Sequence, residues 1–180
     1  MEEIKRVKRE LKFEGTILKF YQDTIQFPNG NSELWDFLGH KGAAAVVPVL
    51  PDGRIIMVRQ YRNALERYTL ELPAGALNEV DEPKDVCAAR ELEEETGYRA
   101  GKLEWLINVN TTVAFCNELI GIYLATELEK TQQHLDENEY VDVVFCELSE
   151  LLDMIYTGKI TDGKTVSGIL AYAHKKDSYT

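Results

Sequence analysis

Residues 75–98, GALNEVDEPKDVCAARELEEETGY, decide the fold, because they join a glycine turn to a short helix crowded with carboxylates. At about 100° per residue, Glu94 lies about 60° to one side of Glu91 and Glu95 about 40° to the other, whereas Glu93 points away. Like charges this close destabilise a helix, so either water or a bound cation must offset their repulsion. Mg²⁺ suits that role, because it takes carboxylate oxygens together with substrate phosphates.

The flanking residues predict where this helix begins and ends. Pro83 suits the first helical position, with Asp81 or Glu82 as the cap, and Gly97 suits the turn that ends the helix. Upstream, residues 71–75 (ELPAG) predict a strand end that enters a glycine turn. The apolar residues predict one inward face, made of Val86, Ala89 and Leu92 with Cys87 and Ala88 beside them.

The spacing of these residues resembles the Nudix hydrolase signature: Gly, five residues, Glu, seven residues, then Arg-Glu-apolar-any-Glu-Glu-any-Gly-apolar. The matching residues are Gly75, Glu82, Arg90, Glu91, Leu92, Glu94, Glu95, Gly97 and Tyr98. Six residues separate Gly75 from Glu82, which we interpret as a one-residue insertion in the loop before the helix. The resemblance covers roughly residues 42–175 and implies an α/β fold, the Nudix-type α/β/α sandwich with a mixed sheet.

The rest of the chain predicts strands and helices compatible with a mixed sheet between helices. A Pro-Asn-Gly-Asn turn at residues 28–31 predicts a hairpin within residues 11–38. Further strands are expected at 42–50, 54–61, 68–72, 103–109, 119–126 and 140–147, and closing helices at 148–156 and 165–175. We therefore expect an N-terminal antiparallel β-region over residues 1–41, serving dimerisation and the substrate pocket, and a Nudix hydrolase domain over residues 42–180.

Composition restricts the class of partner. The net charge is −11, from 20 basic and 31 acidic residues, which argues against nucleic acid or an acidic membrane as a partner. A phosphate substrate remains compatible, because a bound metal reverses the local sign of charge. Cys87, Cys116 and Cys146 lack CxxC spacing and indicate free thiols in a reducing compartment. With no apolar run of about 18 residues, we expect a cytoplasmic protein.

The resemblance implies roles for the residues of the signature. Glu91, Glu94 and Glu95 correspond to the carboxylates that hold Mg²⁺, with Mn²⁺ as an alternative, and Glu94 is thereby also a catalytic residue. The carbonyl of Ala74 corresponds to a further metal ligand. Arg90 and Glu82 are expected to orient the carboxylates, the alternative being an ordinary surface salt bridge.

A general base is expected outside the signature. Residues 136–139 (DENE) resemble the acidic loop of ADP-ribose pyrophosphatases, whose glutamates reach the metals or activate water. This resemblance assigns the base to Glu137 or Glu139. The alternative is a solvated acidic loop.

Residues 58–62 (VRQYR) and 70–75 (LELPAG) resemble the ADP-ribose pyrophosphatase branch, as does 158–166. Arg59 and Arg62 are candidates to bind phosphate or ribose, since a guanidinium forks onto such oxygens, although an ion pair explains either one equally well. Glu71 either hydrogen-bonds ribose hydroxyls or faces water. Trp35 stands where relatives often have arginine; its indole suits stacking on a nucleobase, or packing in the hairpin or a dimer.

ADP-ribose, cleaved to AMP and ribose 5-phosphate, is the leading substrate. Residues 111–115 (TTVAF) lack the proline that ADP-ribose-cleaving members usually carry there, so GDP-mannose or another nucleotide sugar is the alternative. Hydrolysis of a damaged nucleoside triphosphate and a non-catalytic nucleotide-binding module are further alternatives. In this branch the N-terminal β-region commonly packs between subunits, and a lone hairpin is barely stable, so we expect a homodimer.

Residues 158–165 (GKITDGKT) match the P-loop pattern GxxxxGK[ST]. A phosphate-binding P-loop follows a strand and opens a helix, whereas residues 148–156 have helical periodicity. We therefore predict a turn between two helices, with Thr165 capping the second.

Overall fold

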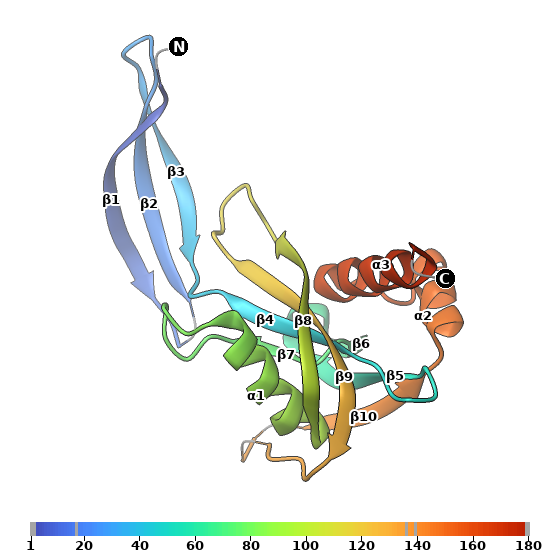
Figure 1. The fold of residues 1–180 in the computed structure, drawn as a ribbon. Helices are drawn as coiled ribbons and strands as arrows, with labels where there is room; N and C mark the ends of the chain where they lie inside the picture. The colour runs from blue at the N-terminus through green and yellow to red at the C-terminus, as the bar shows by residue number, and fades with distance from the viewer. Residues whose placement is uncertain (1–2, 17, 136, 139, 179–180) are drawn as a thin grey trace.

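The computed structural model describes residues 3–16, 18–135, 137–138 and 140–178, and this part of the chain forms three β-sheets and three α-helices (Figure 1). None of the described helices is long and apolar enough to cross a membrane. Cys87 and Cys146 are buried free thiols, and Cys116 is a half-buried one.

The first sheet stands apart from the rest of the molecule (Figure 1). It consists of β1 (Lys5–Glu14), β2 (Lys19–Gln26) and β3 (Ser32–Gly39), all antiparallel. The predicted hairpin is confirmed at the turn before β3, where Gly30 has a φ of 85°. The first strand begins at residue 5 rather than near residue 11.

The second sheet is mixed and positions the candidate site. Its order is β7 (Ala74–Ala76), β4 (Ala43–Pro48), β9 (Leu119–Lys130) and β8 (Tyr98–Asn110), with β4 and β9 parallel and the other pairs antiparallel. Helices α1 (Lys84–Thr96) and α3 (Gly163–Ser178) pack on this sheet.

Strand β4 divides the core between the two helices. Ala45 and Val47 join the cluster that contains Ile169 of α3, whereas Ala44 and Val46 pack with Leu92 of α1. Alternate side chains of a strand point to opposite faces, so these wholly apolar residues explain how one strand supports two layers. The expected α/β/α sandwich is confirmed.

The third sheet contains β10 (Val141–Cys146), β5 (Ile55–Arg62) and β6 (Arg67–Glu71), in that order and antiparallel. The predicted strands at 42–50 and 54–61 therefore belong to different sheets, joined by one bridge between Val49 and Ile55. A short 3₁₀ turn, η1 (Asn63–Leu65), connects β5 to β6, and α2 (Leu148–Tyr156) follows β10.

Helix α1 differs from the prediction at its start. Pro83 occupies the cap position rather than the first helical one, and no side chain caps the helix. Glu82 instead accepts a hydrogen bond from the Asn78 N–H at 2.6 Å, within the preceding loop. The predicted end is confirmed, because Gly97 is left-handed with a φ of 69° and its N–H donates to the Glu93 carbonyl.

The buried face of α1 is also rotated from the predicted one. Val86 is 53% exposed, and the buried apolar residues are Cys87, Ala88 and Leu92. Glu95 is buried on the helix as well, at 2% exposure. This rotation turns a carboxylate toward the protein interior, which apolar periodicity alone does not predict.

The segment at 158–165 links α2 to α3, so a helix precedes it and the P-loop interpretation fails. The cap of α3 is Asp162 rather than Thr165. Its carboxylate accepts from the Thr165 N–H at 3.0 Å and from the Thr165 hydroxyl at 2.6 Å. Asp at this position satisfies donors that the first turn leaves unpaired.

Candidate active site

The glycine turn and helix α1 meet through two carboxylates. A Cβ built on Gly75 would lie 2.2 Å from the Glu91 carboxyl carbon, so only glycine leaves room for this side chain. The Ala74 N–H donates to Glu95 Oε2 at 2.9 Å. Strand β7 is thus held against the acidic helix by the residues that match the metal-binding signature.

Arg90 is the counterion of this carboxylate group. Its Nη1 donates to Glu91 Oε1 at 2.5 Å and to Glu94 Oε2 at 3.0 Å, and its Nε lies 3.6 Å from Glu82 Oε1. Its Nη2 donates to the Ala76 carbonyl at 3.2 Å. Burial opposes the charged form, but the charge and hydrogen bond of Glu91 outweigh it and raise the pKa of Arg90.

Glu93 lies apart from the other three carboxylates, as the helical spacing predicts. Its carboxylate pairs with Arg99 at 2.8 and 3.1 Å on the exposed side of the helix. The acidic run is therefore divided between two sides of the helix. Glu93 makes a surface ion pair, whereas Glu95 faces β7 and Glu91 and Glu94 face Arg90.

The donor chemistry of α1 fits a hard divalent cation. Within the described ranges, no three acidic, histidine or cysteine side chains form a ready-made metal cage. Glu95 instead faces the Ala74 N–H, while Glu91 and Glu94 face Arg90. Mg²⁺ commonly takes only one or two protein carboxylates and completes its shell with water and phosphate oxygens, so these residues suit it.

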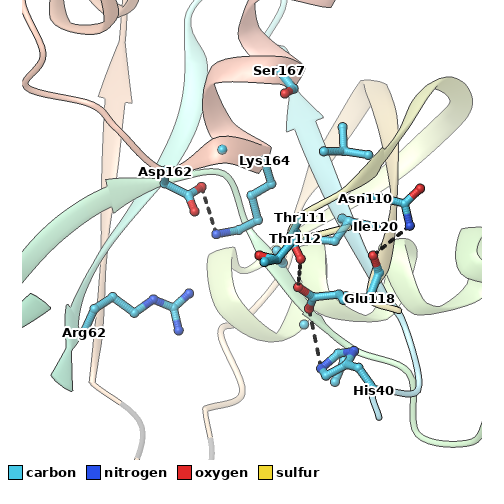
Figure 2. A pocket seen from close by; sticks show the side chains of 16 residues that line it. His40, Arg62, Asn110, Thr111, Thr112, Glu118, Ile120, Asp162, Lys164 and Ser167 are labelled. Atoms are coloured by element: carbon cyan, nitrogen blue, oxygen red, sulfur yellow. Dashed lines mark hydrogen bonds and ion pairs between the residues drawn. The ribbon is translucent and has the colours of Figure 1, made fainter. Parts of the chain in front are cut away.

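A polar pocket of about 530 Å³ lies beside the glycine turn, and Figure 2 shows the polar side chains that line it. Ala74, Gly75 and Ala76 of β7 line it, whereas Glu91, Glu94 and Glu95 do not. Its other lining residues come from separate elements and include Arg62, Asp162 and Lys164 in one group and His40, Thr111, Thr112 and Glu118 in another.

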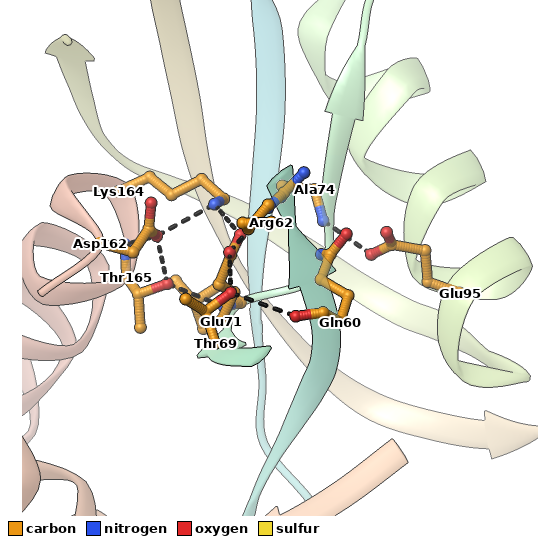
Figure 3. Close-up of polar contacts among 10 residues, drawn as sticks. Gln60, Arg62, Thr69, Glu71, Ala74, Glu95, Asp162, Lys164 and Thr165 are labelled. Atoms are coloured by element: carbon orange, nitrogen blue, oxygen red, sulfur yellow. Dashed lines mark hydrogen bonds and ion pairs between the residues drawn. The ribbon is translucent and has the colours of Figure 1, made fainter. Parts of the chain in front are cut away.

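The first group is an ion-pair network centred on Glu71 (Figure 3). Arg62 donates to both Glu71 oxygens at 2.8 and 2.6 Å, the Thr69 hydroxyl donates at 2.6 Å, and Lys164 donates as well. Burial would raise the pKa of Glu71, but the hydrogen bonds from Arg62 and the charge of Lys164 lower it to about 2. Glu71 is 2% exposed and does not face water.

The second group was not predicted. Thr111 donates to Glu118 Oε2 at 2.6 Å, and His40 Nε2 lies 3.5 Å from Glu118 Oε1. His40 Nδ1 accepts from the Gly42 N–H at 3.0 Å, so Nε2 carries the proton that faces Glu118. No local motif marks these residues, because five strands and helix α1 separate His40 in the sequence from the loop that supplies Thr111 and Glu118.

Three of the four predicted substrate-binding residues do not line this pocket: the buried Glu71, and Arg59 and Trp35. Arg59 is exposed, with its guanidinium 4.7 Å from the Tyr68 ring centroid and 3.8 Å from Asp142. Trp35 lies on β3, 47% exposed, with its ring 6.1 Å from that of Phe27. Neither lines the pocket, whereas Arg62 does.

The acidic loop begins beside the end of α1. The His134 N–H donates to the Glu94 carbonyl at 2.9 Å, and the Gln133 side chain donates to the Glu95 carbonyl at 2.7 Å. Glu137 follows on an exposed turn, and Glu139 lies outside the described residues. Residues 133–134, just before the loop, are thus tied to the helix that carries the carboxylates.

Comparisons with known proteins agree with this geometry. Residues 39–167 match the model of the NUDIX domain. The chain is 40% identical over 169 residues to a methanol dehydrogenase activator of Bacillus methanolicus, and 38% identical over 169 residues to an ADP-ribose pyrophosphatase of Bacillus subtilis (strain 168). Both alignments cover 93% of this chain and 91% of the relative.

The fold is similar to that of a solved ADP compounds hydrolase, with a TM-score of 0.87 at 20% sequence identity. The superposition covers 99% of this chain and 97% of that one. At this identity the likeness establishes the fold, including the separate N-terminal sheet.

Proposed function

The chain belongs to the NUDIX family of hydrolases, and on that premise we propose that it hydrolyses ADP-ribose to AMP and ribose 5-phosphate. The observation that carries the proposal is the pocket of about 530 Å³ that is lined by the glycine turn, where Gly75 lies against Glu91. A diphosphate seated there would share the pocket with the Arg62 guanidinium and with the glycine turn that contacts the α1 carboxylates. The 38% identity to an ADP-ribose pyrophosphatase over 93% of the chain supports this substrate.

Divalent metal ions are general in enzymes of this family, and we propose Mg²⁺, with Mn²⁺ as a substitute. Glu91, Glu94 and Glu95, with the carbonyl of Ala74, are the residues that would hold it. When bound, such an ion polarises phosphoryl oxygens and lowers the pKa of its water.

The remaining steps belong to the side chains of this protein. Arg90 orients Glu91 and Glu94 through the bonds at 2.5 and 3.0 Å. Arg62 offers guanidinium donors to anionic substrate oxygens. Glu137 or Glu139 accepts the proton of the attacking water, from a loop tied to the end of α1.

A homodimer is part of the proposal, with the β1-β2-β3 sheet as the interface. That sheet carries exposed apolar side chains on a single layer: Val7, Leu11, Phe13, Leu34 and Trp35. Sheets this thin need a second layer to bury such residues. In such a dimer Trp35 would either pack at the interface or stack on a nucleobase bound in the partner's pocket. A monomeric mass at micromolar concentration in light scattering would contradict the dimer. We place the protein in the cytoplasm, with its three thiols reduced.

A panel of substrates tests the proposal. The protein is incubated with Mg²⁺ and, separately, ADP-ribose, GDP-mannose, NADH and a nucleoside triphosphate, and the products are identified by chromatography. We expect AMP and ribose 5-phosphate from ADP-ribose. Preferential cleavage of GDP-mannose would support diphosphate hydrolysis but change the assigned substrate. No cleavage of any substrate in the panel would favour a non-catalytic nucleotide-binding module.

A second candidate function follows from the other relative. The 40% identity to a methanol dehydrogenase activator suggests that this chain also stimulates an alcohol dehydrogenase. The test is the rate of an alcohol dehydrogenase with and without this protein. No change at equimolar amounts would contradict the second candidate.

A further inference from the structure

Lys164 lines the pocket, yet its ammonium already forms ion pairs with carboxylates of the protein. It is 8% exposed, and its ammonium contacts Glu71 and, at 3.0 Å, Asp162 Oδ2. A buried ammonium held between two carboxylates is a poor donor to a substrate, because it would have to leave partners that compensate its desolvation.

Glu71 connects Lys164 to Arg62. The bonds from Arg62 use its Nε and Nη2 atoms, so the carboxylate fixes the plane of the guanidinium along one edge. The Arg62 side chain is 42% exposed and lines the pocket. Glu71 therefore fixes the position of the Arg62 guanidinium, and Lys164 helps to fix the position of the Glu71 carboxylate.

Charge balance gives Lys164 a second effect. Arg62 and Lys164 supply two positive charges, and Glu71 and Asp162 supply two negative ones, so the network is neutral as a whole. Without Lys164 the same four positions carry a net charge of −1 beside the pocket. Arg62 would then be drawn toward two carboxylates instead of sharing one of them with Lys164.

We propose that Lys164 is a positioning residue for substrate binding: by sharing Glu71 with Arg62, it keeps the Arg62 guanidinium at the pocket wall and does not contact the substrate. The inference rests on the proposed function, since it takes the substrate to be a diphosphate. The lysine of the P-loop-like segment 158–165 would thus position Arg62 instead of binding phosphate itself.

The test is a double-mutant cycle of Lys164→Met and Arg62→Ala, read as kcat and KM for ADP-ribose with melting temperatures. We expect Lys164→Met to raise KM about tenfold, with little change in kcat, because binding rather than chemistry is affected. In the Arg62→Ala background the same change should have almost no further effect on KM. Lys164→Arg, which keeps the charge, should restore most of the affinity.

Lys175→Met is the matched control, because Lys175 lies on the same helix and pairs with Glu104 outside the pocket lining. It should leave KM unchanged. If Lys164→Met does not fold, Lys164→Gln replaces it in the cycle, since the neutral amide removes the charge that Lys164 brings to Glu71 and remains polar.

Additive effects on KM would show that Lys164 acts without Arg62 and would overturn the inference while leaving the proposed function standing. A wild-type protein that neither cleaves ADP-ribose nor binds it in calorimetry would overturn the proposed function, and this inference with it.

Discussion

The Glu91 carboxylate fills the space in which any residue other than glycine at position 75 would carry its Cβ, at 2.2 Å from the carboxyl carbon. Gly75 has no positive φ, so this position requires glycine for space rather than for backbone conformation. Helix α1 and the glycine turn that lines the pocket therefore fit together because residue 75 lacks a Cβ.

Gly75→Ala is expected to displace Glu91 and lower kcat about 100-fold, because a carboxylate shifted by about 1 Å no longer holds its ligand in place. Steady-state kinetics checks this, with circular dichroism melting as the control for folding. Wild-type kcat in a folded Gly75→Ala protein would show that the position of Glu91 does not matter.

Glu71 should make stability depend on pH in the acidic range. Its pKa falls from 4.5 to about 2 in the folded protein, so its contribution is present above pH 4.5 and is lost as the pH falls toward 2. At 1.36 kcal/mol per pKa unit this contribution is about 3 kcal/mol at neutral pH. Urea unfolding between pH 7 and 3 should show a smaller loss in Glu71→Gln than in the wild type, and parallel curves would refute this.

Thr165 connects α3 to the strand end before the glycine turn. The Leu72 N–H donates to its hydroxyl at 2.9 Å, and Thr165 is fully buried. Thr165→Val leaves that N–H without a partner and removes one of the three hydrogen bonds to Asp162, so the free energy of unfolding should fall by about 2 kcal/mol. Thr161→Val, at an exposed residue that bonds only Arg67 in the described structure, is the control and should cost under about 0.5 kcal/mol. Equal losses in both variants would contradict this role.

The general base is expected in the acidic loop. Glu137→Gln and Glu139→Gln are compared by kcat, and the variant that removes the base should lose about 100-fold. The same variant should also lose the acidic limb of its pH–rate profile. Full activity in both proteins would move the base to another residue.

The sequence predicts those features of the structure that depend on residues close together in the chain, and misses those that depend on residues far apart in it. The turn at 28–31 and the left-handed Gly97 follow from neighbouring residues, and both are confirmed. The bond from Lys164 to Glu71 spans 93 positions, and no local pattern indicates it.

Apolar periodicity failed for a related reason at Val86. That residue is exposed because the contact of Glu95 with the Ala74 N–H, and of Glu91 with Gly75, sets the rotation of the helix. One hydrogen bond across 21 positions and one close packing contact across 16 positions outweighed the burial of one valine, which is worth about 1.5–3 kcal/mol.

The most direct test of the account compares Glu94→Gln with Glu93→Gln in the hydrolysis of ADP-ribose with Mg²⁺, because these neighbours differ only in the direction they face. We predict that the wild type and Glu93→Gln release AMP and ribose 5-phosphate at similar rates, and that Glu94→Gln is slower by about 100-fold or more. Equal rates in the two variants would contradict the assignment of the α1 carboxylates as the catalytic metal site.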